Sequence, residues 1–84
     1  MVANNAGFAY YKMDKYDESV FWFKKAIDAD PNRAVAYLNL GDADVKLSHN
    51  AEARQAYTKY LELAPNSKSA SDIKAKLAAL PPSP

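Results

Sequence analysis

The sequence predicts an all-α fold of five helices arranged as antiparallel helix–turn–helix repeats. Two observations carry this prediction. Helix formers dominate the 84 residues, with two glycines and no strand-like alternation. Residues 1–34 and 35–68 also share one pattern, and eight positions coincide in the two copies: Asn5/Asn39, Gly7/Gly41, Ala9/Ala43, Lys12/Lys46, Glu18/Glu52, Lys25/Lys59, Pro31/Pro65 and Asn32/Asn66. A fixed period of this length is typical of stacked units that cannot bury their apolar faces alone.

The first copy is expected to contain helices at about 2–13 and 17–29. The polar stretch of residues 14–17 separates them and places Asp17 at the second helix start. Pro31 ends the copy, because proline lacks an amide donor and disfavours helix in the residue before it.

The second copy repeats this arrangement, with helices expected at about 33–47 and 51–63. Asn32 is expected to cap the first of them, since its side chain can accept from free backbone amides. The break at residues 48–50 places Asn50 at the next helix start, and Pro65 ends the copy. Short loops make sequential helices antiparallel.

The last segment is expected to form an amphipathic helix at about 68–79, capped by Asn66 or Ser67. Ile73, Leu77 and Leu80 recur at helical spacing and form one apolar stripe. The proline-rich residues 81–84 end the helix and are expected to be a disordered tail or a linker.

Size and composition argue against several function classes. The chain is long enough for one domain, lacks cysteine, and carries interleaved charges that sum to +1. We expect no nucleic-acid face, no membrane insertion, no cofactor and no metal site. No signal or transmembrane segment is recognisable, and the cysteine count leaves a cytoplasmic or a periplasmic location open. The single histidine, His49, lies in a predicted turn without a partner nucleophile, so no catalytic residue is assigned and no enzyme is expected.

The repeated residues resemble the tetratricopeptide repeat, a helix–turn–helix unit of 34 residues. In the first copy the matching residues are Ala6, Gly7, Tyr10, Ser19, Phe23, Ala26 and Pro31, and in the second they are Tyr37, Leu40, Gly41, Ala53, Tyr57 and Pro65. The resemblance covers residues 1–68 and implies a short right-handed superhelix, an α-solenoid. It implies one domain over residues 1–80, made of repeats 1–34 and 35–68 and a capping helix 68–80.

The resemblance also gives a physical role to several positions. Gly7 and Gly41 would lie where the two helices of a unit approach closely, so Gly41→Leu should be harmful and Gly41→Ala nearly neutral or mildly harmful. Tyr60 stands where alanine is usual in the family. That departure implies either a wider packing against the last helix or an exposed ring.

In this family the first helices of successive units line a concave groove. Mapped onto this chain, the groove would present ten residues to a partner: Asn5, Phe8, Tyr11, Lys12, Asn39, Asp42, Val45, Lys46, Ile73 and Lys76. Repeats that grip the C-terminal carboxylate of heat-shock chaperones use lysine, asparagine and arginine at five places. Only Asn39 matches that set, so such tails are not the expected ligand.

The sequence therefore predicts a module that binds a peptide or helix of a protein partner. The alternative is a structural role, either as a segment of a longer repeat array or as a homodimer formed through the N-terminal edge. Phe21 keeps that alternative open, because it stands where the family usually shows a charged residue. It is either a partly covered edge residue or a contact to another repeat or chain.

Overall fold

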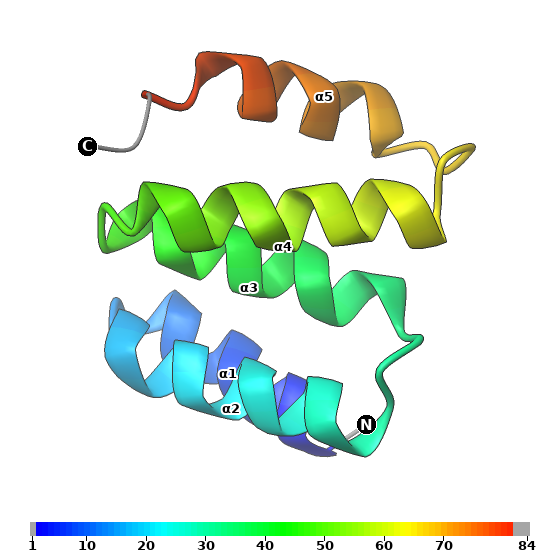
Figure 1. Cartoon of the computed structure of the whole chain (residues 1–84). Helices are drawn as coiled ribbons and strands as arrows, with labels where there is room; N and C mark the ends of the chain where they lie inside the picture. Colours follow the sequence, from blue (N-terminus) through cyan, green and yellow to red (C-terminus); the bar gives the residue numbers. More distant parts are fainter. Residues whose placement is uncertain (1, 82–84) are drawn as a thin grey trace.

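The computed structural model describes residues 2–81, and within this range the chain forms five α-helices and no strand. They are α1 (Val2–Lys12), α2 (Tyr16–Ala29), α3 (Ala34–Lys46), α4 (Asn50–Leu63) and α5 (Ala70–Ala79). Figure 1 shows α1 with α2 and α3 with α4 as two antiparallel pairs, and α5 lying along α4. The predicted all-helical repeat fold is confirmed. Helix ends differ from the prediction by at most one residue, except that α5 begins two residues later.

Each helix pair closes around a glycine. A Cβ atom at Gly7 would lie 2.6 Å from two ring carbons of Phe23, and one at Gly41 would lie 2.5 Å from Cε1 of Tyr57. Phe23 and Tyr57 are 0% and 1% exposed, so neither ring has free space into which it could move. The predicted close approach is confirmed in both units. The expectation that alanine at Gly41 is nearly neutral or mildly harmful is revised toward a clear loss of stability, because even a methyl group overlaps the ring.

The turn inside each pair also repeats. Asp14 and Ser48 stand 34 residues apart and both have a positive φ, of 60° and 61°. That conformation is uncommon for residues other than glycine. It allows the next amides to close the preceding helix: Lys15 N–H donates to the Tyr10 carbonyl at 2.9 Å, and His49 N–H donates to the Asp44 carbonyl at 2.8 Å.

The side-chain cap predicted for α3 is wrong. The N-cap position is Arg33, not Asn32, and its side chain makes no capping hydrogen bond. The backbone N–H of Asn32 instead donates to the Asp30 carboxylate at 3.3 Å, so the junction is held by a local turn around Pro31. Pro31 does lie between helices, as does Pro65.

The cap predicted for α5 is also wrong, and the reason lies in the core. The N-cap is Ser69 rather than Asn66 or Ser67. The Ser67 hydroxyl is paired with the Tyr60 hydroxyl at 2.7 Å. Tyr60 is 5% exposed, so the alternative of an exposed ring is wrong.

The core of the second unit extends under α5, as the apolar stripe predicted. Its buried members are Ala53, Tyr57, Tyr60 and Ile73, and the half-buried hydrophobic residues packed against them are Ala34, Tyr37, Leu38, Leu61, Ala64, Leu77 and Leu80. This packing fixes α5 against α4 and thereby places the C-terminal end of α5 beside α3.

The predicted tail of residues 81–84 lies outside the described residues except for Pro81. The carbonyl of Pro81 accepts a hydrogen bond from Nη2 of Arg54 at 2.8 Å, which ties the end of the described chain to α4. Within residues 2–81, the helices are too short or too polar for any of them to cross a membrane.

Candidate functional site

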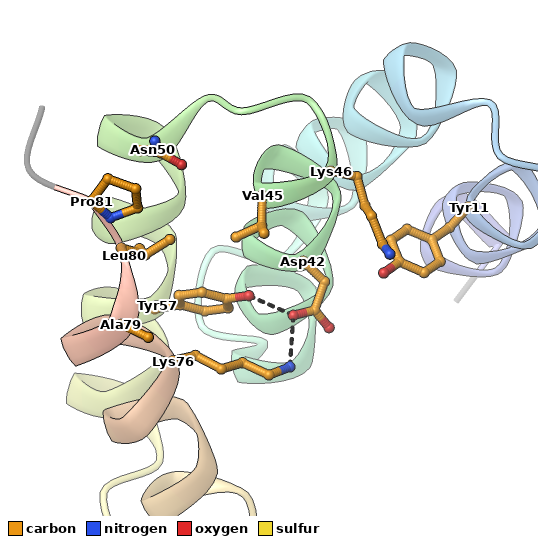
Figure 2. A pocket seen from close by; sticks show the side chains of 10 residues that line it. All are labelled: Tyr11, Asp42, Val45, Lys46, Asn50, Tyr57, Lys76, Ala79, Leu80 and Pro81. Atoms are coloured by element: carbon orange, nitrogen blue, oxygen red, sulfur yellow. Dashed lines mark hydrogen bonds and ion pairs between the residues drawn. The ribbon is translucent and has the colours of Figure 1, made fainter.

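A pocket of about 460 Å³ lies between α3, α4 and the end of α5, with one residue from α1 (Figure 2). This groove pocket is lined by Tyr11, Asp42, Val45, Lys46, Asn50, Tyr57, Lys76, Ala79, Leu80 and Pro81. Its size is within the range of about 300–1,000 Å³ that is usual for ligand sites. Half of the ten predicted groove residues meet here: Tyr11, Asp42, Val45, Lys46 and Lys76.

Asp42 is the polar centre of the groove pocket. Its Oδ1 accepts the Tyr57 hydroxyl at 2.6 Å and the Lys76 ammonium at 3.2 Å, so one carboxylate oxygen joins α3, α4 and α5. Burial raises the pKa of Tyr57, and the hydrogen bond to Asp42 raises it further, so the phenol remains a donor. The Lys76 ammonium is half-exposed and contributes less, since exposed ion pairs are weak.

Lys46 and Tyr11 line the side of the pocket farthest from α5 in Figure 2. Lys46 is exposed, and within residues 2–81 its ammonium forms no ion pair or hydrogen bond. Burial raises the pKa of Tyr11, with a further contribution from Asp42, so this hydroxyl is also neutral. The pair therefore offers a ligand one unpaired positive charge and one neutral hydroxyl.

Apart from Asn50, the remaining wall of the pocket is apolar. Val45 on α3 is 37% exposed, and Ala79, Leu80 and Pro81 follow one another at the end of α5. Figure 2 shows Ala79 and Leu80 beside the ring of Tyr57, Pro81 next to Asn50, and Val45 on the side toward Lys46. The groove pocket therefore combines an apolar surface with a few directional polar groups, which is typical of recognition sites.

Three predicted residues on α1 lie outside the pocket. Asn5, Phe8 and Lys12 are exposed, and the Lys12 ammonium lies 4.7 Å from the centre of the Phe8 ring. At this distance the cation and the ring attract each other. These residues extend the same face along α1 but are not part of the enclosed volume.

The two other predicted residues have structural contacts. Asn39 donates through Nδ2 to Oδ1 of Asn4 at 3.1 Å, which links α3 to α1 through an amide that is 9% exposed. Ile73 is 1% exposed and belongs to the core beneath α5. Its assignment to the groove is therefore wrong, because an apolar side chain packed against Tyr57 and Tyr60 offers no surface to a ligand.

Five lining residues were not among the predicted site residues. Asn50 is predicted to start a helix, Tyr57 matches a position of the repeat, and Leu80 belongs to the apolar stripe of the last helix. Ala79 and Leu80 follow Lys76 by three and four residues, which places them on one helical face. That spacing could have identified them, whereas Pro81 lies beyond the helix and had no such signal.

His49 has a neighbour that the sequence did not indicate. Its Nδ1 lies 3.6 Å from Oδ1 of Asp44, whose side chain is 2% exposed, while the His49 side chain is 47% exposed. Burial raises the pKa of Asp44, and the nearby His49 and Lys24 partly lower it. The second carboxylate oxygen of Asp44 is buried and has no hydrogen-bond partner within the described chain. Residues 2–81 contain no group of three or more histidines and carboxylates placed to hold a metal ion.

The model of the tetratricopeptide repeat family matches residues 1–66 of this chain. The chain is similar to the uncharacterised protein ycf37 of Guillardia theta, with 30% identity over 82% of this chain and 39% of that protein. It is 30% identical to a TPR repeat-containing protein of Borreliella burgdorferi over 76% of this chain and 28% of that protein. It is 31% identical to the protein O-mannosyl-transferase Tmtc3 of Drosophila melanogaster over 89% of this chain and 8% of that protein. The chain thus spans a minor part of each of these relatives.

Proposed function

Because this chain belongs to the tetratricopeptide repeat family, whose repeats are generally protein-interaction modules, we propose that it binds a protein partner through the groove pocket. The tetratricopeptide repeat is a non-catalytic fold, and we extend that property to this chain. The ligand would be an extended peptide or one helix of the partner. The observation that carries the proposal is the pocket itself. Lys46, which is unpaired, and the Tyr11 hydroxyl lie on one side of it, the apolar wall lies on the other, and Asp42 lies between them.

The charges of the pocket favour a ligand of mixed character. The Lys46 ammonium can pair with an acidic side chain of the ligand, while Val45, Leu80 and Pro81 can pack against an apolar one. A purely acidic ligand fits less well. Asp42 lies between Lys46 and Lys76 in the pocket, and its carboxylate would repel a second one. The near-neutral net charge of +1 likewise favours a protein partner over nucleic acid.

The test begins with peptides selected from a displayed random library on the unmodified chain. Tyr11→Ala combined with Lys46→Ala should weaken their binding strongly, because an aromatic anchor and the unpaired cation of the pocket are both lost. The control is Phe21→Ala combined with His49→Ala, since neither of those residues lines the pocket. Fluorescence anisotropy gives the affinities, and circular dichroism checks that all variants remain folded.

Salt supplies an independent readout. The part of the affinity due to Lys46 should fall as ionic strength rises, whereas the part due to the apolar wall should not. Equal weakening in the pocket and control variants would contradict the proposal. So would selected peptides whose binding is unaffected by both pocket substitutions.

A further inference from the structure

Two hydrogen-bond donors of the groove pocket have no acceptor within the described chain. The Lys46 ammonium and the Tyr11 hydroxyl both line the pocket, and neither makes a hydrogen bond or an ion pair within residues 2–81. Figure 2 shows both side chains at the side of the pocket farthest from α5. A carboxylate placed there can accept from both, and hydrogen bonds to an ionised acceptor are the stronger kind.

The ring of Tyr11 is held in place by a neighbour. It meets the ring of Tyr16 edge-on, with the two ring centres 5.4 Å apart, and the Tyr16 hydroxyl donates to Oδ1 of Asp14 at 2.8 Å. A donor that is already positioned loses less conformational freedom on binding than a mobile one. The Tyr11 hydroxyl is therefore available to a ligand without a rearrangement of α1.

The carboxylate of Asp42 opposes an acidic ligand at this place, and Lys76 counters it. Asp42 lies one helical turn before Lys46 on α3. Burial raises the pKa of Tyr11, and Asp42 raises it further, whereas Lys76 lowers it, so both charges act on the Tyr11 hydroxyl. Because the Lys76 ammonium lies 3.2 Å from Oδ1 of Asp42, these two charges largely balance, and Lys46 carries the excess positive charge of the pocket.

The first unit has a different arrangement at the equivalent positions. Counting back 34 residues from Asp42 and Lys46 leads to Phe8 and Lys12. The Lys12 ammonium lies 4.7 Å from the centre of the Phe8 ring, which attracts it. An unpaired lysine beside a balanced carboxylate therefore distinguishes the second unit from the first.

We propose that the groove pocket selects a partner segment with one acidic side chain beside an apolar one, and that Lys76 determines this charge preference by balancing Asp42. The acidic side chain accepts from Lys46 and Tyr11, and the apolar one packs against the apolar wall. This inference rests on the proposed binding of a protein partner by the groove pocket. It gives α5 a role in specificity, because this helix brings Lys76 to Asp42.

Removing the charges one at a time should change the preference in opposite directions. In Lys76→Met the charges of Asp42 and Lys46 cancel, so the preference for an acidic side chain should disappear. Asp42→Asn in that background removes the opposing charge, keeps an oxygen that can accept from Tyr57, and should restore the preference. Asp42→Asn alone should increase it, which tests the same balance without a change in α5. A purely structural role of Lys76 predicts neither the rescue nor the increase.

Peptides selected from a displayed random library on the unmodified chain serve as the probe, each synthesised with its acidic residue as Glu and as Gln. Fluorescence anisotropy gives the ratio of the two dissociation constants. The Glu form should bind the unmodified chain about two- to fivefold more tightly, the size usual for an exposed ion pair, and both forms should bind Lys76→Met alike. Lys74→Met is the matched control, because it removes the same charge from an exposed position of α5 outside the pocket. Circular dichroism verifies the fold of each variant.

The outcomes separate this inference from the proposed function. If Tyr11→Ala with Lys46→Ala leaves peptide binding intact, the proposed function is wrong and this inference is overturned with it. If that variant weakens binding but the preference for Glu survives in Lys76→Met, only this inference is overturned. The same holds if Asp42→Asn fails to restore the preference in Lys76→Met, or if the selected peptides contain no acidic residue.

Discussion

At the scale of single residues, the contact between Gly41 and Tyr57 leaves no room for a side chain. Gly41→Ala should destabilise the chain, because a methyl group 2.5 Å from a buried ring forces overpacking that costs about 1–3 kcal/mol. The gain of about 1 kcal/mol in helix propensity offsets only part of this cost. Chemical denaturation measures the change in the free energy of unfolding.

Combining Gly41→Ala with Tyr57→Leu supplies the control for this prediction. If the ring is the obstacle, the alanine should cost less beside leucine than beside tyrosine, and the double-mutant cycle should show coupling. Strictly additive effects would mean that the alanine acts through something other than Tyr57.

The buried carboxyl of Asp44 gives a prediction about pH. Its pKa is raised by burial, so the fold favours the protonated acid. The resulting stabilisation is complete below the unfolded pKa of about 3.9 and is lost as the pH rises through the folded pKa. Asp44→Asn, which remains neutral, should therefore melt at a higher temperature than the parent at pH 7, and this advantage should shrink toward acid pH.

Thermal melts followed by circular dichroism across this pH range measure the effect. Asp28→Asn is the matched control, because Asp28 is an exposed carboxylate on α2 and its replacement should change the melting temperature little at any pH. An Asp44→Asn variant that is less stable than the parent at pH 7 would show that the charged form is better solvated than its burial indicates.

At the scale of helices, α5 is held mainly by Ile73, the larger of its two buried side chains. Ile73 is 1% exposed and packs against Tyr57 and Tyr60, so Ile73→Ala should cost about 2–5 kcal/mol. This loss is a large part of the stability of a small domain, which is about 5–15 kcal/mol in general. Lys74→Ala on the exposed face of α5 should stay within about 0.5 kcal/mol. Comparable denaturation midpoints for the two variants would place Ile73 outside the core.

At the scale of the whole molecule, the helices form a row in which each mainly contacts its neighbours. The backbone of α3 lies close to those of α1, α2 and α4, whereas the backbone of α5 lies close only to that of α4 and α5 reaches α3 through the Lys76–Asp42 pair. Backbone amides in α3 and α4 should therefore exchange with solvent most slowly, and those in α5 faster, because a terminal element can open without the others. Hydrogen exchange measured by mass spectrometry or NMR gives the order in which the helices lose protection.

The same measurement on Ile73→Ala tests how far a local change travels. Exchange should accelerate in α5 and the adjoining face of α4, while α1 should remain as in the parent, since the backbones of α5 and α1 do not come close within residues 2–81. Uniform acceleration along the chain would instead indicate that the five helices open as one unit.

Much of this fold follows from local chemistry. Pro31 and Pro65 each end a helix, because proline lacks the amide donor that would continue it. The 34-residue period repeats one helix–turn–helix unit, and in both copies a glycine lies opposite an aromatic ring. These features depend on backbone geometry and on side-chain size, which are properties of short segments. The resemblance to the tetratricopeptide repeat, which rests on these residues, implied five of the residues that line the groove pocket.

The rest was decided by contacts between residues far apart in the chain. Helical spacing predicts which residues share a face, but not how deeply that face is buried, so Ile73 could be assigned both to the core and to the groove. Tyr60 is buried in the core and its hydroxyl is paired with Ser67, and Lys76 reaches Asp42 across 34 residues only because α5 lies along α4. Depth of burial and long-range polar pairing depend on the rotation and position of whole helices, and only the tertiary structure determines these.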